Sequence, residues 1–150
     1  MHHDQFGAFP SGGLNWNSDR TMNGGAPADY QTQAWGWAYQ ILPYLEQKAL
    51  WEHPSSATVA GTSLKVFRCP SLRGPTKFPY TQSTPNGDRA QMDYVGNGGT
   101  WGSFDPNAAN AFDGPITASG KKKISISNIK DGTSSTLLSG EKYLNIKTAN

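Results

Sequence analysis

TQAWGWAYQILPYLEQKALWEH, from Thr32 to His53, is the stretch that most clearly predicts how this chain folds. Its apolar residues recur at steps of three and four and form one stripe along a helix, made of Ala34, Ala38, Ile41, Leu45 and Ala49. Pro43 lacks an N–H and its ring clashes with the preceding turn, so we expect a kink or a break into two helices there. Pro54 then ends the helical run.

The segments on either side of this helix are predicted to be irregular or to form short strands. Residues 1–31 are polar and interrupted by glycine pairs, which predicts irregular structure. Later in the chain, Asp131-Gly132 predicts a tight turn. Apolar and alternating runs predict short strands at residues 63–69, 92–96, 124–127 and 136–138. Loops are predicted at residues 71–91 and 100–120. We therefore expect one loop-rich α+β domain over residues 1–150, with short strands and long loops over 63–143. In it, a kinked helix or helical pair packs on a small, mostly antiparallel sheet.

The composition limits the class of protein. Hydrophobic residues make up 35% of the 150 residues, but 5 Trp, 6 Tyr and 6 Phe predict a folded chain whose core depends on large rings. The net charge of +2 is nearly balanced, which argues against nucleic acid as a partner. Cys69 is the only cysteine, which excludes an internal disulfide. No apolar run approaches the roughly 18 residues of a transmembrane helix, so we expect a soluble chain without a membrane span.

The familiar catalytic motifs are missing from the sequence. It contains no G-x-S-x-G elbow, no H-E-x-x-H zinc motif and no phosphate-binding glycine loop. The segment richest in oxygen ligands contains Asp105, Asn107 and Asp113, and carboxylate and amide oxygens suit Ca²⁺. These three residues are the candidate metal ligands, with calcium as the candidate cofactor. The alternative is a polar surface loop in which Asp and Asn side chains form local turns.

Tryptophans offer a second kind of candidate site. Trp35, Trp37 and Trp101 are candidate binding residues, because indole rings can form a stacking platform for sugars or other flat ligands. The alternative is that their helical and strand context places them in the core.

Five phrases in order along the chain carry a resemblance to a known family. They are H-D-x-x-G-x-F-P at 3–10, W-x-x-x-I-L-P-Y-L-E-Q at 37–47, F-x-C-P at 67–70, Y-V-G-N-G at 94–98 and I-x-D-G-T-S-x-T-L-L-x-G-E at 129–141. The chain thereby resembles the large bacterial family of PulG-like proteins, a domain of unknown function provisionally called putative transporters. Members of that family resemble type II secretion pseudopilins and type IV pilins, in which a prepilin leader and a long hydrophobic helix precede an α+β head.

The resemblance implies a function and a location. This chain starts where such a head would begin, so the N-terminal helix and any filament role are expected to belong to a longer parent. In that parent the head would lie in the periplasm or cell envelope and contact other pseudopilin or secretion-system subunits. Similarity to major pseudopilins also implies a calcium ion that stabilises the head, although no motif here carries over its ligands.

Three functions are consistent with the sequence. The leading hypothesis is a non-catalytic, pseudopilin-like envelope domain with a structural or assembly role. The first alternative is a small, metal-assisted hydrolase of esters or lactones that uses activated water; its catalytic residues are unknown. The second alternative is a periplasmic module that binds a solute or glycan through the tryptophans.

Overall fold

The computed structural model describes residues 1–14, 17–72, 77–82, 84–100 and 113–143. Within these ranges the chain forms a loop-rich α+β fold, which confirms the predicted fold class. Its α-helices are α1 (His2–Phe6), α2 (Trp37–Gln40), α3 (Lys48–Trp51) and α4 (Ser56–Gly61). Its short 3₁₀ helices are η1 (Leu42–Leu45), η2 (Lys65–Phe67) and η3 (Ile126–Asn128). Its strands are β1 (Met22–Asn23), β2 (Ala26–Pro27), β3 (Lys77–Tyr80), β4 (Gly87–Ala90), β5 (Tyr94–Gly96) and β6 (Ser139–Glu141).

The predicted helical stretch is broken, as the proline predicts. α2 and α3 are separated by η1, which contains Pro43 in its first turn. Glu46, which follows η1, adopts a left-handed conformation with φ 60° and caps η1 before α3 begins. The prediction is wrong at its N-terminal end, because α2 begins at Trp37 rather than at Thr32. Gly36 precedes it in an extended conformation, so the helical run starts only after this residue.

Two predicted strands are short helices instead. Residues 63–69 contain η2, and a backbone hydrogen bond from the Asp93 N–H to the Phe67 carbonyl holds its last residue. Residues 124–127 end in η3, because the Ser125 N–H and hydroxyl both donate to the Asn128 side-chain oxygen and begin a helical turn. Here local caps and a distant contact override the alternation of apolar residues.

Two segments predicted to lack regular structure contain hairpins. Residues 1–31 hold α1 and the antiparallel pair β1–β2, joined by Gly24 and Gly25, whose φ angles of 58° and 87° suit a tight hairpin turn. Residues 71–91 hold the antiparallel pair β3–β4. The strand predicted at 92–96 is confirmed over β5, and the one predicted at 136–138 lies slightly later, in β6. The turn at Asp131-Gly132 is confirmed, with Gly132 at φ 86°.

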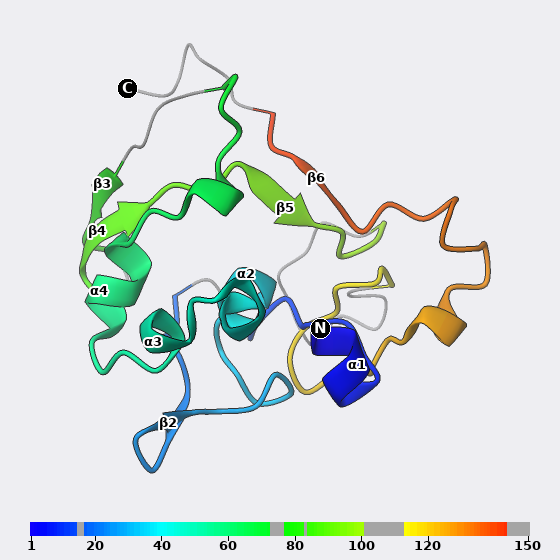
Figure 1. Ribbon diagram of the computed structural model, residues 1–150, viewed down its shortest axis with the longest axis horizontal. Coiled ribbons are helices and arrows are strands. Elements are labelled where there is room, and N and C mark those ends of the chain that lie inside the picture. Colours follow the sequence, from blue (N-terminus) through cyan, green and yellow to red (C-terminus); the bar gives the residue numbers. More distant parts are fainter. Residues whose placement is uncertain (15–16, 73–76, 83, 101–112, 144–150) are drawn as a thin grey trace.

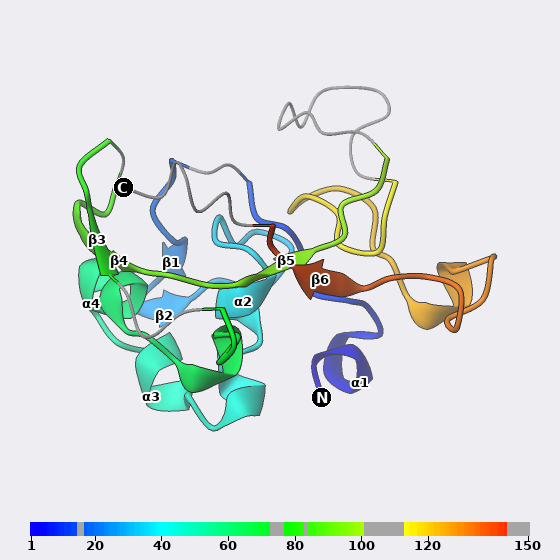
Figure 2. The same cartoon turned by 90° about the horizontal axis from the view of Figure 1, so that it is seen from above.

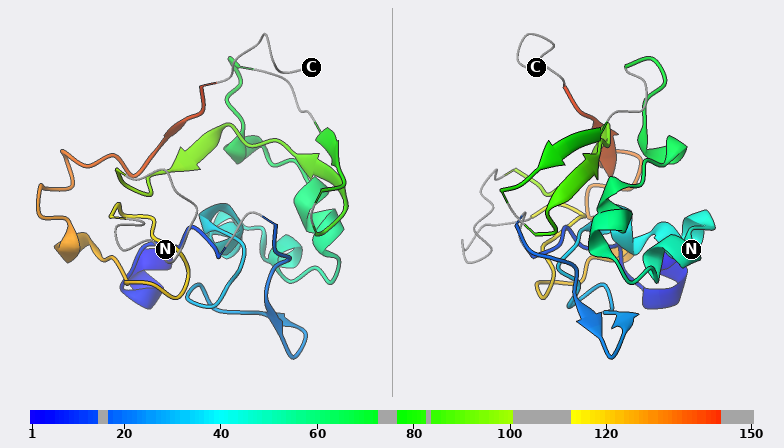
Figure 3. Two further views of the ribbon diagram at one scale, coloured as in Figure 1. Left: turned by 180° about the vertical axis from the view of Figure 1, so that it is seen from behind. Right: turned by 90° about the vertical axis from the view of Figure 1, so that its left-hand side faces the viewer.

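The elements gather around a small aromatic core. Tyr39, Leu42 and Val59 are its buried members, and the rings of Trp35, Trp51 and Phe67 pack against them. Figure 1 shows α2, α3 and α4 close together, with the β3–β4 hairpin beside α4. Figure 2 shows that residues 120–138 form an arm that extends away from these helices, past α1. The β1–β2 hairpin projects on the side opposite to β5 and β6 (Figure 3).

A buried polar network joins distant parts of the chain. The Ser119 hydroxyl donates to the Gln33 carbonyl oxygen at 2.6 Å and lies 2.6 Å from the Ser11 hydroxyl. The Ser11 N–H donates to the Gln40 side-chain oxygen at 2.8 Å. Because buried polar groups are costly unless they are paired, these bonds fix the N-terminal segment and residues 116–119 against α2. None of the helices in the described ranges combines the length and apolar character that crossing a bilayer requires.

Candidate functional site

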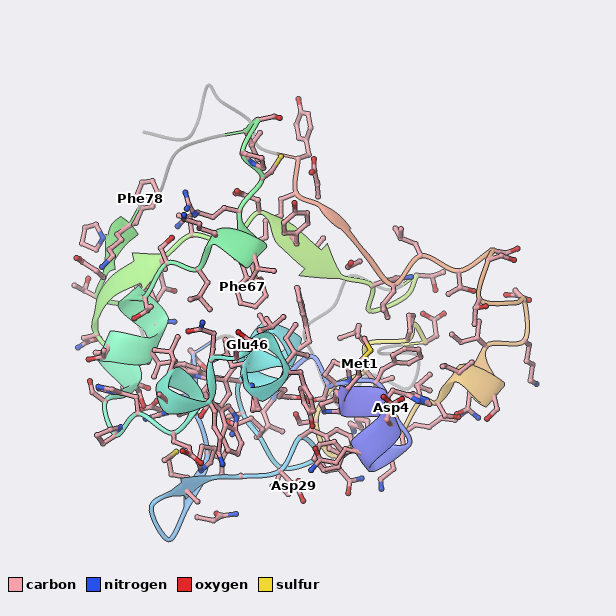
Figure 4. The ribbon with its side chains drawn as sticks, viewed as in Figure 1. Met1, Asp4, Asp29, Glu46, Phe67 and Phe78 are labelled. Carbon is pink, nitrogen blue, oxygen red and sulfur yellow. The ribbon has the colours of Figure 1, made fainter. Side chains whose placement is uncertain are left out.

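A pocket of about 420 Å³ lies between α2, α4, η2 and β4. Its walls are largely apolar and include Trp35, Trp37, Leu42, Val59, Leu64 and Phe67. This volume falls in the range of roughly 300–1,000 Å³ that is usual for small-molecule sites. Figure 4 shows the Phe67 side chain pointing from η2 towards α2. The pocket therefore lies where the helical stretch meets the segments that follow it.

Hydrogen bonds hold Trp35 at its backbone N–H, its backbone carbonyl and its indole ring. Its N–H donates to the Gln33 side-chain oxygen at 3.2 Å, and its carbonyl accepts a hydrogen bond of 2.8 Å from the Gln40 side chain. Its indole N–H donates to the Ser18 carbonyl at 3.1 Å. The ring meets Tyr39 edge to face, with centroids 5.2 Å apart. Trp35 is thus a fixed wall of the pocket.

Trp37 forms the neighbouring wall. Its ring is perpendicular to that of Phe67, with centroids 5.9 Å apart. A Cβ at Gly96 in β5 would lie only 3.0 Å from the Trp37 indole nitrogen and 3.1 Å from a carbon of Ile116. Glycine at position 96 is therefore what allows β5 to approach the Trp37 ring this closely.

A buried arginine, Arg20, makes hydrogen bonds to Tyr39 and to the segment around α3 and α4. Arg20, only 5% exposed, donates to Ser56 Oγ at 3.0 Å and to the Tyr39 hydroxyl at 3.2 Å. It also donates to the backbone carbonyls of Trp51 and His53. Burial raises the pKa of Tyr39, whose hydroxyl stays protonated and donates to the Trp51 carbonyl at 2.7 Å. Arg20 is not among the predicted site residues, because nothing in its local sequence distinguishes it from a surface arginine.

Arg89 in β4 is a charged residue among those that line the pocket. Its Nη2 donates to the carbonyls of Thr84 at 3.2 Å and Pro85 at 3.1 Å, and its guanidinium lies 4.9 Å above the ring of Tyr80. Among the described residues that line the pocket, Arg89 is the only charged one. These contacts hold the guanidinium in one place, and the sequence offered no signal for it.

The predicted metal ligands are only partly described. Asp105 and Asn107 lie outside the described residues, as does Trp101 from the predicted binding set. Asp113 is exposed, and its carboxylate accepts hydrogen bonds from the Thr100 N–H at 2.7 Å and hydroxyl at 2.6 Å. These bonds lower the pKa of Asp113, so its carboxylate is ionised at neutral pH.

The calcium site stays a prediction. Within the described part of the chain, no group of three or more His, Cys, Asp or Glu side chains is placed to hold a metal ion. The hydrolase alternative depends on such a site and stays a prediction with it. Of the three predicted binding tryptophans, the structure brings Trp35 and Trp37 together at the pocket.

A second surface carries exposed apolar side chains. Val95 in β5 is 44% exposed, and Leu137 and Leu138, just before β6, are 65% and 43% exposed. The side chain of Asn97 donates to the Leu137 carbonyl at 2.8 Å and its N–H donates to the Leu138 carbonyl at 2.9 Å. These bonds hold the two leucines beside β5. We call Val95, Leu137 and Leu138 the β5–β6 apolar surface.

Comparison with known proteins identifies the family. The model of a family described as "Protein of unknown function (DUF1559)" matches residues 1–149. The chain belongs to that family. All five phrases noted in the sequence lie within the matched range, as do the pocket and the β5–β6 apolar surface. Searches of curated proteins and of solved structures found no match.

Proposed function

We propose that this chain is a non-catalytic assembly domain of a bacterial cell-envelope protein, similar to the heads of pseudopilins. The proposal is carried by the β5–β6 apolar surface. The proposed location is the periplasm or cell envelope, and the proposed partners are other pseudopilin-like or secretion-system subunits. Membership of the DUF1559 family is compatible with this role, and the family's description gives no function of its own.

The geometry of the surface suits contact with another protein chain. Val95 pairs with Gly140 across the β5–β6 ladder, and a Cβ on Gly140 would lie 3.7 Å from Leu137 Cδ2. Leu137 therefore lies over Gly140, the glycine that pairs with Val95. The side chains of Leu137 and Val95 thus form one apolar area. Contiguous apolar patches larger than roughly a few hundred Å² are rare on soluble monomers and often mark contacts with other proteins. The outer edge of a two-stranded sheet also presents backbone groups that a further strand can pair with.

Photo-crosslinking in cells tests the assembly role. A photoreactive amino acid replaces Leu137 in the full-length protein, and the matched control carries it at Ser127, an exposed polar position on the same arm. We expect Leu137 to crosslink to a second copy of the protein or to a subunit with a prepilin leader, identified by mass spectrometry. The control should give little product. Equal crosslinking yields from the two positions would contradict the proposal. A fusion of the full-length protein to alkaline phosphatase, which is active only in the periplasm, tests the location.

A second candidate function is solute binding, favoured by the pocket at Trp35 and Trp37. Both indole rings line one cavity of about 420 Å³ beside Phe67. A ligand there would change the fluorescence of two of the five tryptophans in the chain. Titration of small aromatic compounds should therefore change the intrinsic emission in a saturable way. An emission spectrum that does not respond to any of them would count against this function.

A further inference from the structure

We propose that the pocket binds a small apolar carboxylate with a flat ring, and that Arg89 is the residue that selects its charge. This inference deepens the solute-binding candidate and rests on it, but it is independent of the assembly role. It also narrows the range of ligands, because the sequence alone left sugars and other solutes equally open.

The walls of the pocket favour an apolar body for the ligand. Besides the two tryptophans, Leu42, Val59 and Phe67 contribute to the lining. Hydroxyl and amide side chains on the described lining are few, namely those of Ser18, Tyr39, Thr62 and Gln91. The Tyr39 hydroxyl is already engaged with Arg20 and the Trp51 carbonyl. A sugar exposes many hydroxyl groups that lose their water partners on binding, so this lining suits a glycan poorly.

The arrangement of the rings favours a flat ligand. Trp35 meets Tyr39, and Trp37 meets Phe67, with interplanar angles of 82° and 86°. Aromatic rings pack favourably edge to face and in offset stacks, so a planar guest can add to either pair without displacing it. The hydrogen bonds at Trp35 hold its ring before a ligand arrives, which reduces the entropy lost on binding.

The charge of Arg89 favours an anion. Arg89 is the one charged residue on the described lining, and the residue as a whole is half-buried. A planar guanidinium matches a carboxylate in shape and charge, and the pair strengthens where water is partly excluded. The contacts with Thr84, Pro85 and Tyr80 fix the position of the guanidinium, so little side-chain freedom is lost when the anion binds.

Calorimetric titration of the full chain with naphthoate and with naphthylmethanol tests the inference, because the two probes share their rings and differ in charge. We expect naphthoate to bind at least about tenfold more tightly, the usual effect of one charge-assisted hydrogen bond. Arg89→Gln should bring the ratio of the two affinities close to one, whereas Arg89→Lys should retain part of it. Arg68→Gln is the control for loss of charge, since Arg68 lies outside the pocket lining.

A second pair of variants locates the site and remains informative if Arg89→Gln does not fold. Ala60→Trp fills the pocket from α4, while Ala57→Trp places the same ring on the exposed side of that helix. Binding of both probes should be lost in the first and kept in the second. Equal affinity of the wild-type chain for the two probes would overturn the carboxylate inference and leave solute binding in place. No heat of binding for either probe would overturn both.

Discussion

Gln33→Leu tests the hydrogen bonds that hold the site together. Gln33 is fully buried, and its side-chain oxygen accepts from the Thr21 N–H at 2.8 Å and from the Trp35 N–H at 3.2 Å. Its side-chain nitrogen donates to the carbonyls of Thr21 and Ala28. Leucine fills a similar space but leaves two backbone N–H groups without their acceptor, and each such loss costs about 1–3 kcal/mol. Since Thr21 is half-buried, the lower half of this range applies, and we expect a total loss of about 3 kcal/mol.

Urea unfolding followed by tryptophan fluorescence measures this loss, with the free energy extrapolated linearly to zero denaturant. For a chain of this size, about 3 kcal/mol lowers Tm by roughly 6–12 °C. Gln31→Leu is the matched control: its side chain is half-buried two residues away, and we expect a change within about 0.5 kcal/mol. If Gln33→Leu also stayed within about 0.5 kcal/mol, the argument that Gln33 clamps the hairpin to Trp35 would be refuted.

Three further predictions follow from single residues. Burial lowers the pKa of His2 below its usual 6.5, so the unfolded chain binds more protons just below that pH. Thermal stability should therefore be fully present above pH 6.5 and fall as the pH drops further, and His2→Phe should flatten this dependence. Gly13→Ala should destabilise the fold by about 1–3 kcal/mol more than Gly25→Ala, measured by urea unfolding. Both glycines have φ 87°, but a Cβ at Gly13 would lie 2.5 Å from the Ala34 carbonyl, whereas a Cβ at Gly25 meets nothing; equal losses would disprove the clash. If the predicted calcium site exists, millimolar Ca²⁺ should raise Tm by a few degrees, with reversal by chelator and a smaller effect in Asp113→Asn; an unchanged Tm in wild type would remove calcium from the proposal.

Features set by a single residue's backbone chemistry were predictable from the sequence. The break around Pro43 follows from a missing N–H and a ring clash, which no tertiary context removes. The turn at Asp131-Gly132 follows from the freedom of glycine to adopt positive φ. The extended segment at Tyr94–Gly96 followed from a short apolar run before a turn, whereas its pairing with β6 depends on a distant partner. The five motifs that indicated a family resemblance can likewise be recognised in the sequence without the tertiary structure.

Features that depend on distant partners were not predictable in this way. Residues 63–69 have the composition of a strand, yet they form η2 where the Asp93 N–H reaches the Phe67 carbonyl. The β3–β4 hairpin arose in a segment that prolines had marked as loop. In both cases the local conformational preference is weak, so the tertiary environment that buries the side chains and accepts the hydrogen bonds determines the conformation.

The candidate site divides in the same way. The sequence alone determined that Trp35 and Trp37 were available as flat apolar surfaces close together in the chain. Only the tertiary structure placed Phe67 opposite Trp37 and brought Arg89, more than 50 positions away, to the same pocket. The physical reason is that a pocket is made from contacts between segments, and the energy of those contacts depends on burial and geometry that residue order does not specify.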